Sequence, residues 1–353
     1  MEYFLSLAYD TDAHSSDGIE EWTTRWVARQ FGPEHAGEIA EIISSYTKFN
    51  GRRKPELLSP STYSLTDYRE AERIVSEYNT LAARAEEIQN ELPQEMHDAY
   101  FHLVLFPVKA CALVNELYVT AGKNALYASQ GRSTAGMMAD RTEELFIADT
   151  TLMGYYNRVY AGGRWNHFMD QAHLGYLNWA DPPENSLRAI KLSRIAVSEA
   201  ASMGVSVEGS DKSWPGGEET PALPSFDVFN KPERFIEVFN KGTNPFEYSV
   251  TADNQWIILS KTGGTVRGED RIGIRMDWTM LTYGRHQGFV TVQAAGSEVT
   301  VALQAFNPAV PQPATLKGFV EADGYISIEA EHYTTVLNPD MRYWERIEGY
   351  GRT

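Results

Sequence analysis

The sequence predicts a multidomain protein of the α-then-β class, in which an antiparallel α-helical bundle is followed by a β-sandwich. Three observations carry this prediction. Up to about residue 160, apolar side chains recur every three or four positions, the period of an amphipathic helix. Between about residues 235 and 303 they recur at every second position, the period of a half-buried strand. Residues 208–224 and 308–313, which are rich in glycine or proline, separate these parts.

Consecutive helices account for the first part of the chain. The first ends at Gly32-Pro33, and the clearest begins at the capping residues Ser64 to Asp67. Pro107 should kink the fourth helix, because its ring removes a backbone donor. Short connections between long amphipathic helices favour an antiparallel bundle. The expected helices span residues 19–31, 34–49, 64–92, 94–128 and 133–160, and a last helix or connector spans 190–203.

The change of period also sets the expected domain boundaries. Residues 1–204 are assigned to the bundle, 205–224 to a linker and 225–307 to the sandwich. Residues 308–353 are a proline-stiffened linker and the start of an incomplete C-terminal β domain, because about forty residues bury too small a core to fold alone. The expected strands span 235–239, 246–250, 256–259, 272–278, 289–294 and 299–303, with a further pair in GFVEADGYISIEAEHY (318–333).

Composition excludes several classes of protein. A chain of 353 residues with 42% hydrophobic and 22% charged residues is typical of a soluble globular protein. A net charge of -17 and the lack of a basic stripe argue against nucleic acid as a partner. Cys111 is the only cysteine, so no intramolecular disulfide or cysteine-based metal cluster is expected. No run of eighteen apolar residues occurs, so no membrane-spanning helix is predicted.

The stretch GGRWNHFMDQAHLGYLNWADPP (162–183) is the candidate site. Two glycines open it and two prolines close it, which predicts a loop or a broken helix. Aromatic faces beside amide, imidazole and carboxylate groups suit a sugar, whose C–H faces stack on rings while its hydroxyls need hydrogen-bond partners. A connector between domains, with polar side chains that satisfy loop backbone, explains the same composition. The spacing of His167, Asp170 and His173 does not favour one compact zinc site.

Other polar residues lie on the apolar faces of the predicted helices. The basic turn at 50–55 is interpreted as a solvated loop. Lys123, the stretch Gln130–Arg132 and Asp149 are expected near helix ends, on the same side of the bundle as the loop at 162–183. Together they would form one polar, aromatic-lined surface. Three residues are interpreted as satisfied core groups: His102, Asn115 and Asn124.

Five stretches and the tail of the chain follow the order and spacing of a known family. The five stretches are KFNGRRKPELLSPSTYS (48–64), LVLFPVKACALVNELY (103–118), KNALYASQGR (123–132), residues 162–183 and residues 235–242, and the tail is GYISIEAEHYTTV (324–336). On these residues the chain resembles the C-terminal half of glycoside hydrolase family 115, the xylan α-1,2-glucuronidases. The tail resembles the start of the family's C-terminal domain, and together the stretches cover nearly all of the chain in the family's order.

The resemblance implies a helical bundle, a β-sandwich and a C-terminal β domain similar to carbohydrate-binding jelly rolls. It also implies hydrolysis, with inversion and without a cofactor, of the α-1,2 bond between (4-O-methyl-)glucuronic acid and xylan. Inversion needs an acid and a base about 6.5–9.5 Å apart. In the family these groups lie in an N-terminal α/β barrel, which this chain lacks. No catalytic residue is therefore assigned here, and the chain alone is predicted to be inactive.

The resemblance further implies that the loop faces the barrel and lines the sugar cleft. A guanidinium suits the glucuronate carboxylate, whereas Asp170 is expected to orient a neighbour. The expected partners are glucuronoxylan or a related acidic plant polysaccharide and the missing barrel, with a homodimer as a further option and no membrane. The missing contact should leave an apolar or aromatic patch. The predicted substrate-binding residues are Arg164, Trp165, Asn166, His167, Asp170, Gln171, His173 and Tyr176.

An extracellular or periplasmic location is expected for the full-length protein. The opening MEYFLSLAYDTDA lacks a basic segment followed by a long apolar core, so a signal peptide would lie on the missing part. A stand-alone, non-catalytic protein that binds carbohydrate or acts as a scaffold is the alternative. The segment Ile328–Glu331 is similar to the Ca²⁺-binding start of some jelly rolls, but its two carboxylates cannot fill six to eight oxygen positions. No metal site is expected.

Overall fold

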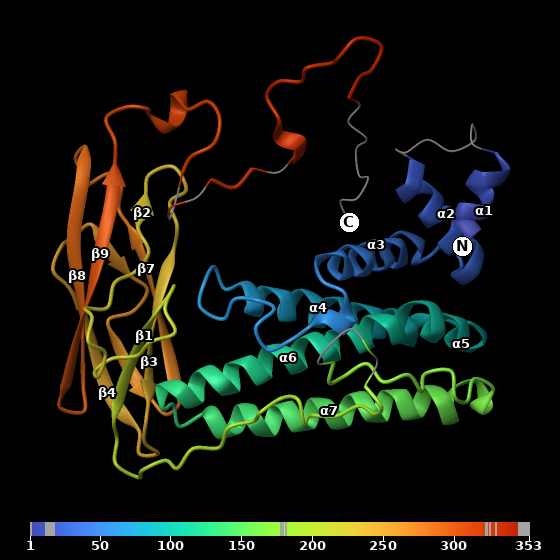
Figure 1. The fold of residues 1–353 in the computed structure, drawn as a ribbon, viewed down its shortest axis with the longest axis horizontal. Helices are drawn as coiled ribbons and strands as arrows, with labels where there is room; N and C mark the ends of the chain where they lie inside the picture. The colour runs from blue at the N-terminus through green and yellow to red at the C-terminus, as the bar shows by residue number, and fades with distance from the viewer. Residues whose placement is uncertain are drawn as a thin grey trace.

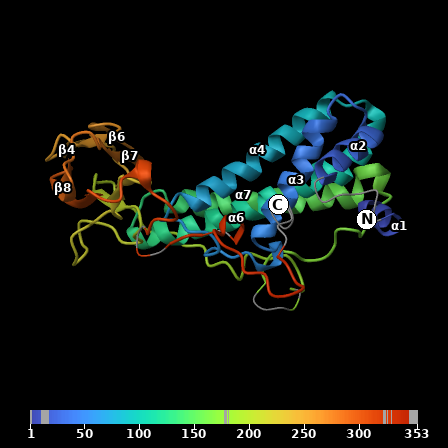
Figure 2. The same ribbon diagram turned by 90° about the horizontal axis from the view of Figure 1, so that it is seen from above.

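Helices form the first part of the chain and mostly antiparallel sheets the second, as the sequence predicts (Figure 1). The computed structural model describes residues 2–10, 18–176, 180, 182–321, 324, 326–328 and 330–344. The sheets lie at one end of the long helices, and α1 and α2 lie at the other (Figure 2). The helices are α1 Glu2–Tyr9, α2 Ile19–Phe31, α3 Ala36–Arg52, α4 Glu70–Glu91, α5 His97–Tyr100, α6 Phe106–Gln130 and α7 Ala135–Arg158.

Helix α4 begins at Glu70, six residues later than predicted, because Ser64 and Asp67 form a turn of their own. The Asp67 amide donates to the Ser64 hydroxyl at 3.0 Å, and that hydroxyl donates to the Asp67 carboxylate at 2.9 Å. The Ser64 amide donates to the Glu70 carboxylate at 2.7 Å. Such local side-chain bonds compete with helical ones. The capping residues therefore shape the approach to the helix rather than its first turn.

The helical stretch predicted to kink at Pro107 contains a π-helical segment, Phe101–Leu105, just before α6. Pro107 follows in the first turn of α6 and lacks the backbone amide that a continuous helix would use there. The stretch Gln94–Gln130 is long and apolar enough to cross a membrane by length and composition, which differs from the expectation drawn from uninterrupted apolar runs. However, 61% of its most apolar window is buried, and α6 packs against both α4 and α7. A core helix of a soluble protein has the same properties.

After α7 the chain returns along the helices to the sheets as a connector with little regular structure (Figure 1). Residues 190–202 contain no helix. Asn124 of α6 holds this segment, since its side chain accepts from the Ser193 amide at 2.7 Å and donates to the Ser193 carbonyl at 2.8 Å. Asn124 is thus a satisfied core group. Residues 177–179 and 181 of the candidate stretch, Trp179 among them, lie outside the described residues.

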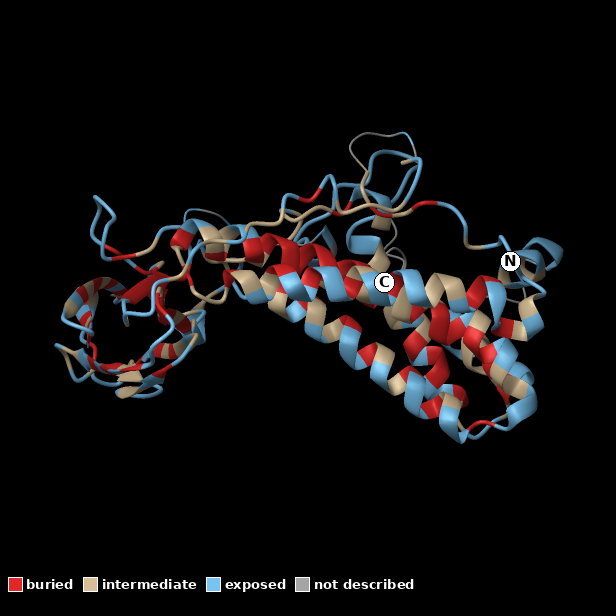
Figure 3. Cartoon of the chain, turned by 90° about the horizontal axis from the view of Figure 1, so that it is seen from below, coloured by how far each residue is buried: buried red, intermediate tan, exposed pale blue. Residues whose placement is uncertain are grey.

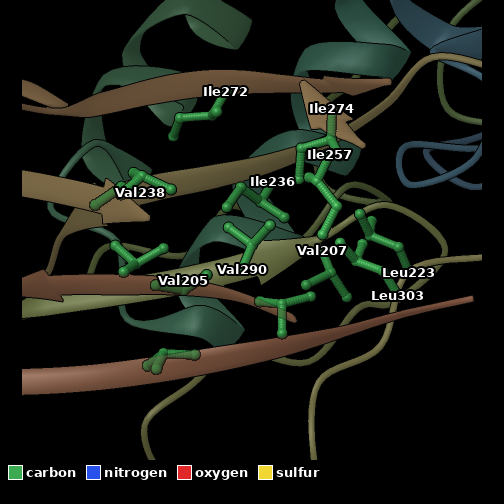
Figure 4. Close-up of a cluster of buried hydrophobic side chains, with 14 of the residues drawn as sticks. Val205, Val207, Leu223, Ile236, Val238, Ile257, Ile272, Ile274, Val290 and Leu303 are labelled. Carbon is green, nitrogen blue, oxygen red and sulfur yellow. The ribbon is translucent and has the colours of Figure 1, made fainter. Parts of the chain in front are cut away.

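Two sheets enclose one hydrophobic core. The first has the strand order β1-β3-β7-β5 and the second β2-β9-β8-β4-β6. Neighbouring strands pair antiparallel, except that β2 and β9 are parallel. Both sheets contribute to the core, for example through Ile236 and Val290 (Figure 4). The strands are β1 Met203–Val207, β2 Phe226–Asp227, β3 Arg234–Asn240, β4 Phe246–Ala252, β5 Ile257–Leu259, β6 Gly263–Val266, β7 Glu269–Met276, β8 Gly284–Ala294 and β9 Ser297–Asn307.

Residues 205–224, expected to form a linker, contribute to the core of the sheets instead. Val205 and Val207 belong to β1 and are buried. Trp214 pairs with Val205 through two backbone hydrogen bonds, of 2.7 and 2.8 Å, and its side chain joins the core. The glycine, proline and acidic residues between these apolar residues dominate the composition of the segment. The composition of the segment therefore does not reveal that Val205, Val207 and Trp214 anchor it in the core.

Among the described residues beyond β9, the helical elements are short 3₁₀ turns at Pro313–Thr315 and Ala330–His332. The strand pair predicted within 318–333 is absent from the described residues of that range, which are 318–321, 324, 326–328 and 330–333. Glu329 of the suggested Ca²⁺ motif lies outside them.

A network of buried and partly buried polar side chains joins the helices to the first sheet, and we call this set the junction: Glu72, Arg132, Ser206, Glu237 and Arg271. Arg132 is 1% exposed, and its guanidinium lies between the rings of Tyr127 and Phe239, 4.2 and 4.3 Å from their centroids. It donates to Glu237 and to Ser206, each at 2.8 Å. Because Arg132 contacts Glu237 and Phe239 of β3, these residues are buried although they alternate with residues of the sheet core, and β3 is buried at almost every position.

Arg271 of β7 extends the junction to α4. It donates to Glu72 at 2.7 Å and to Glu237 at 2.8 Å. The expectation that Gln130–Arg132 lies beside the loop at 162–183 is wrong. These residues precede α7, and residues 162–169 follow it, so the 24 residues of α7 separate them from the first part of the loop. At about 1.5 Å per residue this is roughly 36 Å. Figure 3 shows the buried residues concentrated on the central helices and inside the sheets.

Candidate functional site

The candidate loop starts with a chain reversal at the end of α7. Ala161, Gly162 and Gly163 have φ values of 48°, 67° and 74°, the left-handed region that glycine adopts most easily. A Cβ on Gly163 would lie 3.1 Å from the Arg158 carbonyl oxygen. The reversal brings residues 164–169 back to the helical end near the π-helical segment, where Trp165 and Phe168 contact His102.

Aromatic rings from three segments meet at this end of the helices. The ring of His102 lies 5.6 Å from Trp165 and 6.4 Å from Phe168, centroid to centroid, and its Nδ1 lies 2.7 Å from the Tyr156 hydroxyl. Trp165 and Phe168 meet edge to face at 5.5 Å. Trp165 is 36% exposed and Phe168 57% exposed. We call His102, Trp165 and Phe168 the aromatic patch, and its open ring faces can stack on a ligand.

His167 and Asp170 form a pair at the outer side of the loop. Nδ1 of His167 lies 2.6 Å from Oδ2 of Asp170, and both side chains are mostly exposed. The other carboxylate oxygen of Asp170 accepts from the Asn157 amide at 2.8 Å, and Asn157 also accepts from the Met169 backbone amide at 2.8 Å. Asn157 on α7 therefore fixes the carboxylate that orients the imidazole.

His173 anchors the next part of the chain to the middle of α7. Its Nε2 lies 2.9 and 3.0 Å from the two carboxylate oxygens of Asp149, which is fully buried. Burial acts to lower the pKa of His173, but the hydrogen bond with Asp149 and its charge outweigh burial and raise the pKa. Asn185 accepts from the backbone amides of His173 and Leu174 at 2.7 and 2.9 Å. These bonds make His173 part of an anchor beneath the loop.

The eight predicted binding residues thus fall into different environments. Arg164, Trp165, Asn166 and His167 are consecutive and exposed, and the Arg164 guanidinium forms no ion pair with any described residue. Tyr176 donates to the Ala172 carbonyl at 3.3 Å, and the Gln171 carbonyl lies 3.3 Å from Nδ1 of His173. Gln171, His173 and Tyr176 therefore make local contacts within the connector.

The carboxylates in and beneath the candidate loop are engaged by neighbouring side chains. Asp170 is the only carboxylate between residues 162 and 176, and it is engaged by two neighbours. Asp149 is enclosed beneath His173. No group of three or more His, Cys, Asp or Glu side chains in the described part of the chain could hold a metal ion. The sequence analysis missed the roles of Phe168 and Asn157. The only sequence signal for these two roles is the spacing of Phe168 from Trp165 and of Asn157 from Asp170 along the chain.

Two family models match the ends of the chain. The model of glycosyl hydrolase family 115 matches residues 1–57, and the model of the C-terminal domain of the same family matches residues 318–353. Both models describe the same family of glycosyl hydrolases. They agree with the resemblance drawn from the sequence and leave the candidate loop outside the matched ranges.

Among solved structures, the chain is similar to a family 115 4-O-methyl-α-glucuronidase with specificity for decorated arabinogalactans. That similarity has 16% identity and a TM-score of 0.40, and it covers 85% of this chain and 43% of the other. A Bacteroides ovatus family 5 xyloglucanase is similar at 19% identity and a TM-score of 0.22, over 30% of this chain and 20% of the other. The periplasmic chaperone SfaE follows at 12% identity and a TM-score of 0.23, over 31% and 60%. No curated protein sequence matches the chain.

Proposed function

We propose that the chain belongs to glycoside hydrolase family 115 and forms the C-terminal part of a xylan α-1,2-glucuronidase. The observation that carries this proposal is the pair of family matches, to one family and in the order of its domains, at residues 1–57 and 318–353. In this proposal the helices form a bundle, the two sheets a β-sandwich and the tail the start of a jelly-roll-like domain. The chain spans 43% of the length of the family 115 structure to which it is similar. The activity therefore belongs to the longer enzyme.

The role of this chain is to complete the sugar cleft. Trp165 offers an aromatic face, and Arg164 beside it offers a guanidinium that forms no ion pair with a described residue. Such a pair suits the ring and the carboxylate of glucuronate. His167, held by Asp170, adds an oriented imidazole. The barrel supplies the acid and base for inverting hydrolysis, and the enzyme acts on glucuronoxylan outside the cytoplasm.

Release of 4-O-methylglucuronate from glucuronoxylan tests this proposal. We expect no release by the chain alone and release when a separately expressed family 115 barrel is added. A decorated arabinogalactan as a parallel substrate tests the choice of polysaccharide. Release by the chain alone would contradict the assignment of catalysis to the barrel.

A stand-alone carbohydrate-binding protein is the second candidate. The observation that favours it is that the aromatic patch is already exposed in this chain, while the junction ties helices and sheets into one unit. If this candidate holds, the chain alone binds glucuronoxylan and an added barrel produces no release. Activity of the mixture would exclude it.

A further inference from the structure

A pocket of about 600 Å³ lies far from the aromatic patch, between the end of α3 and the start of α4. Arg52, the last residue of α3, and Arg53, which follows it, line the pocket on one side. Arg73, in the first turn of α4, also lines it. The loop at 58–63 forms the remaining wall, with the side chains of Ser61, Thr62 and Tyr63. We call this site the arginine pocket. Its basic residues belong to the turn that the sequence analysis interpreted as a solvated loop.

The charges of the arginine pocket are only partly neutralised. Arg52 pairs with Glu77 at 2.6 Å. Arg53 donates to the Leu57 carbonyl at 3.1 Å, and within the described residues neither Arg53 nor Arg73 lies within ion-pair distance of a carboxylate. Glu70, the acid of the lining, accepts from the Ser64 amide at 2.7 Å. Two arginines without an ion-pair partner among the described residues therefore line one cavity, in a chain whose net charge is -17.

The hydroxyl-bearing wall is fixed before any ligand arrives. The Ser59 amide donates to the Thr62 hydroxyl at 2.8 Å, and the Thr62 amide donates to the Ser59 carbonyl at 3.1 Å. Leu58 is buried in a core cluster with residues of α6. A Cβ on Gly122 of α6 would lie 2.3 Å from the Pro60 carbonyl oxygen, so helix and loop are in close contact. A pre-organised wall reduces the entropic cost of binding.

The pocket combines the groups that an acidic sugar needs. Guanidinium groups bind carboxylates through two parallel hydrogen bonds, and hydroxyls exchange hydrogen bonds with sugar hydroxyls. The volume lies within the range of about 300–1,000 Å³ that is typical of small-molecule sites. We propose that the arginine pocket binds a uronate residue of an acidic glycan, as a second site separate from the loop at 162–176. The choice of a glycan as the source of the carboxylate rests on the proposed function.

The two sites are well separated along one helical stretch. His102 of the aromatic patch and Gly122 beneath the pocket are twenty residues apart in sequence within Gln94–Gln130. At about 1.5 Å per residue, this corresponds to roughly 30 Å. A polysaccharide with several uronate side chains can engage both sites, which raises its avidity without changing either site. The arginine pocket would then retain the glycan while another side chain occupies the cleft.

Titration of the 353-residue chain with sodium glucuronate, followed by NMR, tests this proposal without the barrel. We expect glucuronate to bind, glucose not to bind, and the double variant Arg53→Gln, Arg73→Gln to bind at least tenfold more weakly. The matched control Arg275→Gln removes an exposed guanidinium on β7, outside both sites, and should leave this binding within twofold. All three arginines are exposed, so the variants should keep the thermal stability of the native chain.

Sodium sulfate in a parallel titration separates a uronate site from a general anion site. Sulfate binding as tight as that of glucuronate, unchanged binding by the double variant, or an equal loss of binding in Arg275→Gln would each overturn the proposal. A reconstituted enzyme that releases no glucuronate would contradict the proposed function and leave this titration unaffected.

Discussion

The junction and the candidate loop each place an arginine among aromatic rings, yet the two arginines have opposite environments. Arg132 is enclosed between Tyr127 and Phe239 and donates to a buried carboxylate. Arg164 is exposed beside Trp165 and forms no ion pair with a described residue. The side chains are alike, so partners and burial decide their roles. An arginine whose donors are paired with other protein groups holds two parts of the fold together, whereas an exposed arginine without an ion pair can bind a ligand.

Replacing the buried arginine should have the largest effect on stability. Arg132→Ala removes a buried guanidinium that pairs with Glu237, and breaking a buried pair costs about 3–5 kcal/mol of unfolding free energy, part of which the remaining contact between Glu237 and Arg271 should offset. Arg164→Ala should change it by less than about 0.5 kcal/mol, as is usual for exposed sites. Urea denaturation measures both values. Equal effects of the two substitutions would refute the contrast between junction and loop.

Lowering the pH should have the second-largest effect on stability, because it weakens the junction. Burial acts to raise the pKa of Glu72, but its hydrogen bond with Arg271 and the charge of Arg271 outweigh burial and lower the pKa from 4.5 to about 2. A carboxylate whose pKa is lower in the folded state than in the unfolded state contributes its full stabilisation of the fold when the pH is above the pKa of the unfolded state. This contribution, of about 1–3 kcal/mol, is lost as the pH falls from about 4.5 towards 2. Urea denaturation as a function of pH should show the loss.

The variant Glu72→Gln supplies the control for the acid experiment. It cannot titrate at this position, so its stability should fall less steeply over the same pH range. Glu237, whose pKa is also lowered, still titrates in this variant, so part of the slope remains. A slope identical to that of the native chain would remove Glu72 from the explanation.

The anchor beneath the loop should show the opposite pH dependence, with a smaller effect. The pKa of His173 is raised in the folded state, so its pair with Asp149 contributes fully below the unfolded pKa and less as the pH rises through the folded value. We expect a loss of about 1 kcal/mol or less, because the imidazole is partly exposed. Hydrogen exchange of residues 172–176 across this pH range should follow the same change. In His173→Gln the pH dependence should disappear; its persistence would contradict the assignment.

Replacing the exposed tryptophan should affect stability least and function most. Trp165→Ala should leave the urea midpoint almost unchanged and reduce glucuronate release by the reconstituted enzyme at least tenfold. Tyr283→Ala, which removes an exposed aromatic residue from the sheets, is the matched control and should retain activity. Equal activity of both variants would exclude Trp165 from the sugar cleft.

The sequence predicts local features of this fold better than distant contacts. Helix α2 has the bounds predicted from Gly32-Pro33, and β3 contains the predicted strand at 235–239, because both signals lie within the segments themselves. Arg132 was placed at the wrong end of the helices, because its partner Glu237 is 105 residues away. The loop was found from its composition, but its contacts with His102 depend on packing that no local pattern records. Its role in binding remains a prediction.

Helix α6 runs without interruption from the π-helical segment to Gln130, beside the junction. Gly122 of α6 contacts the loop at 58–63 beside the arginine pocket, and His102 of the aromatic patch lies in the π-helical segment, so one continuous helical stretch links the two sites. The distance between the two sites sets the shortest polymer that can contact both of them at once. Short oligosaccharides reach only one of them, so the affinity of the chain for acidic glycans should rise abruptly at the length that spans both.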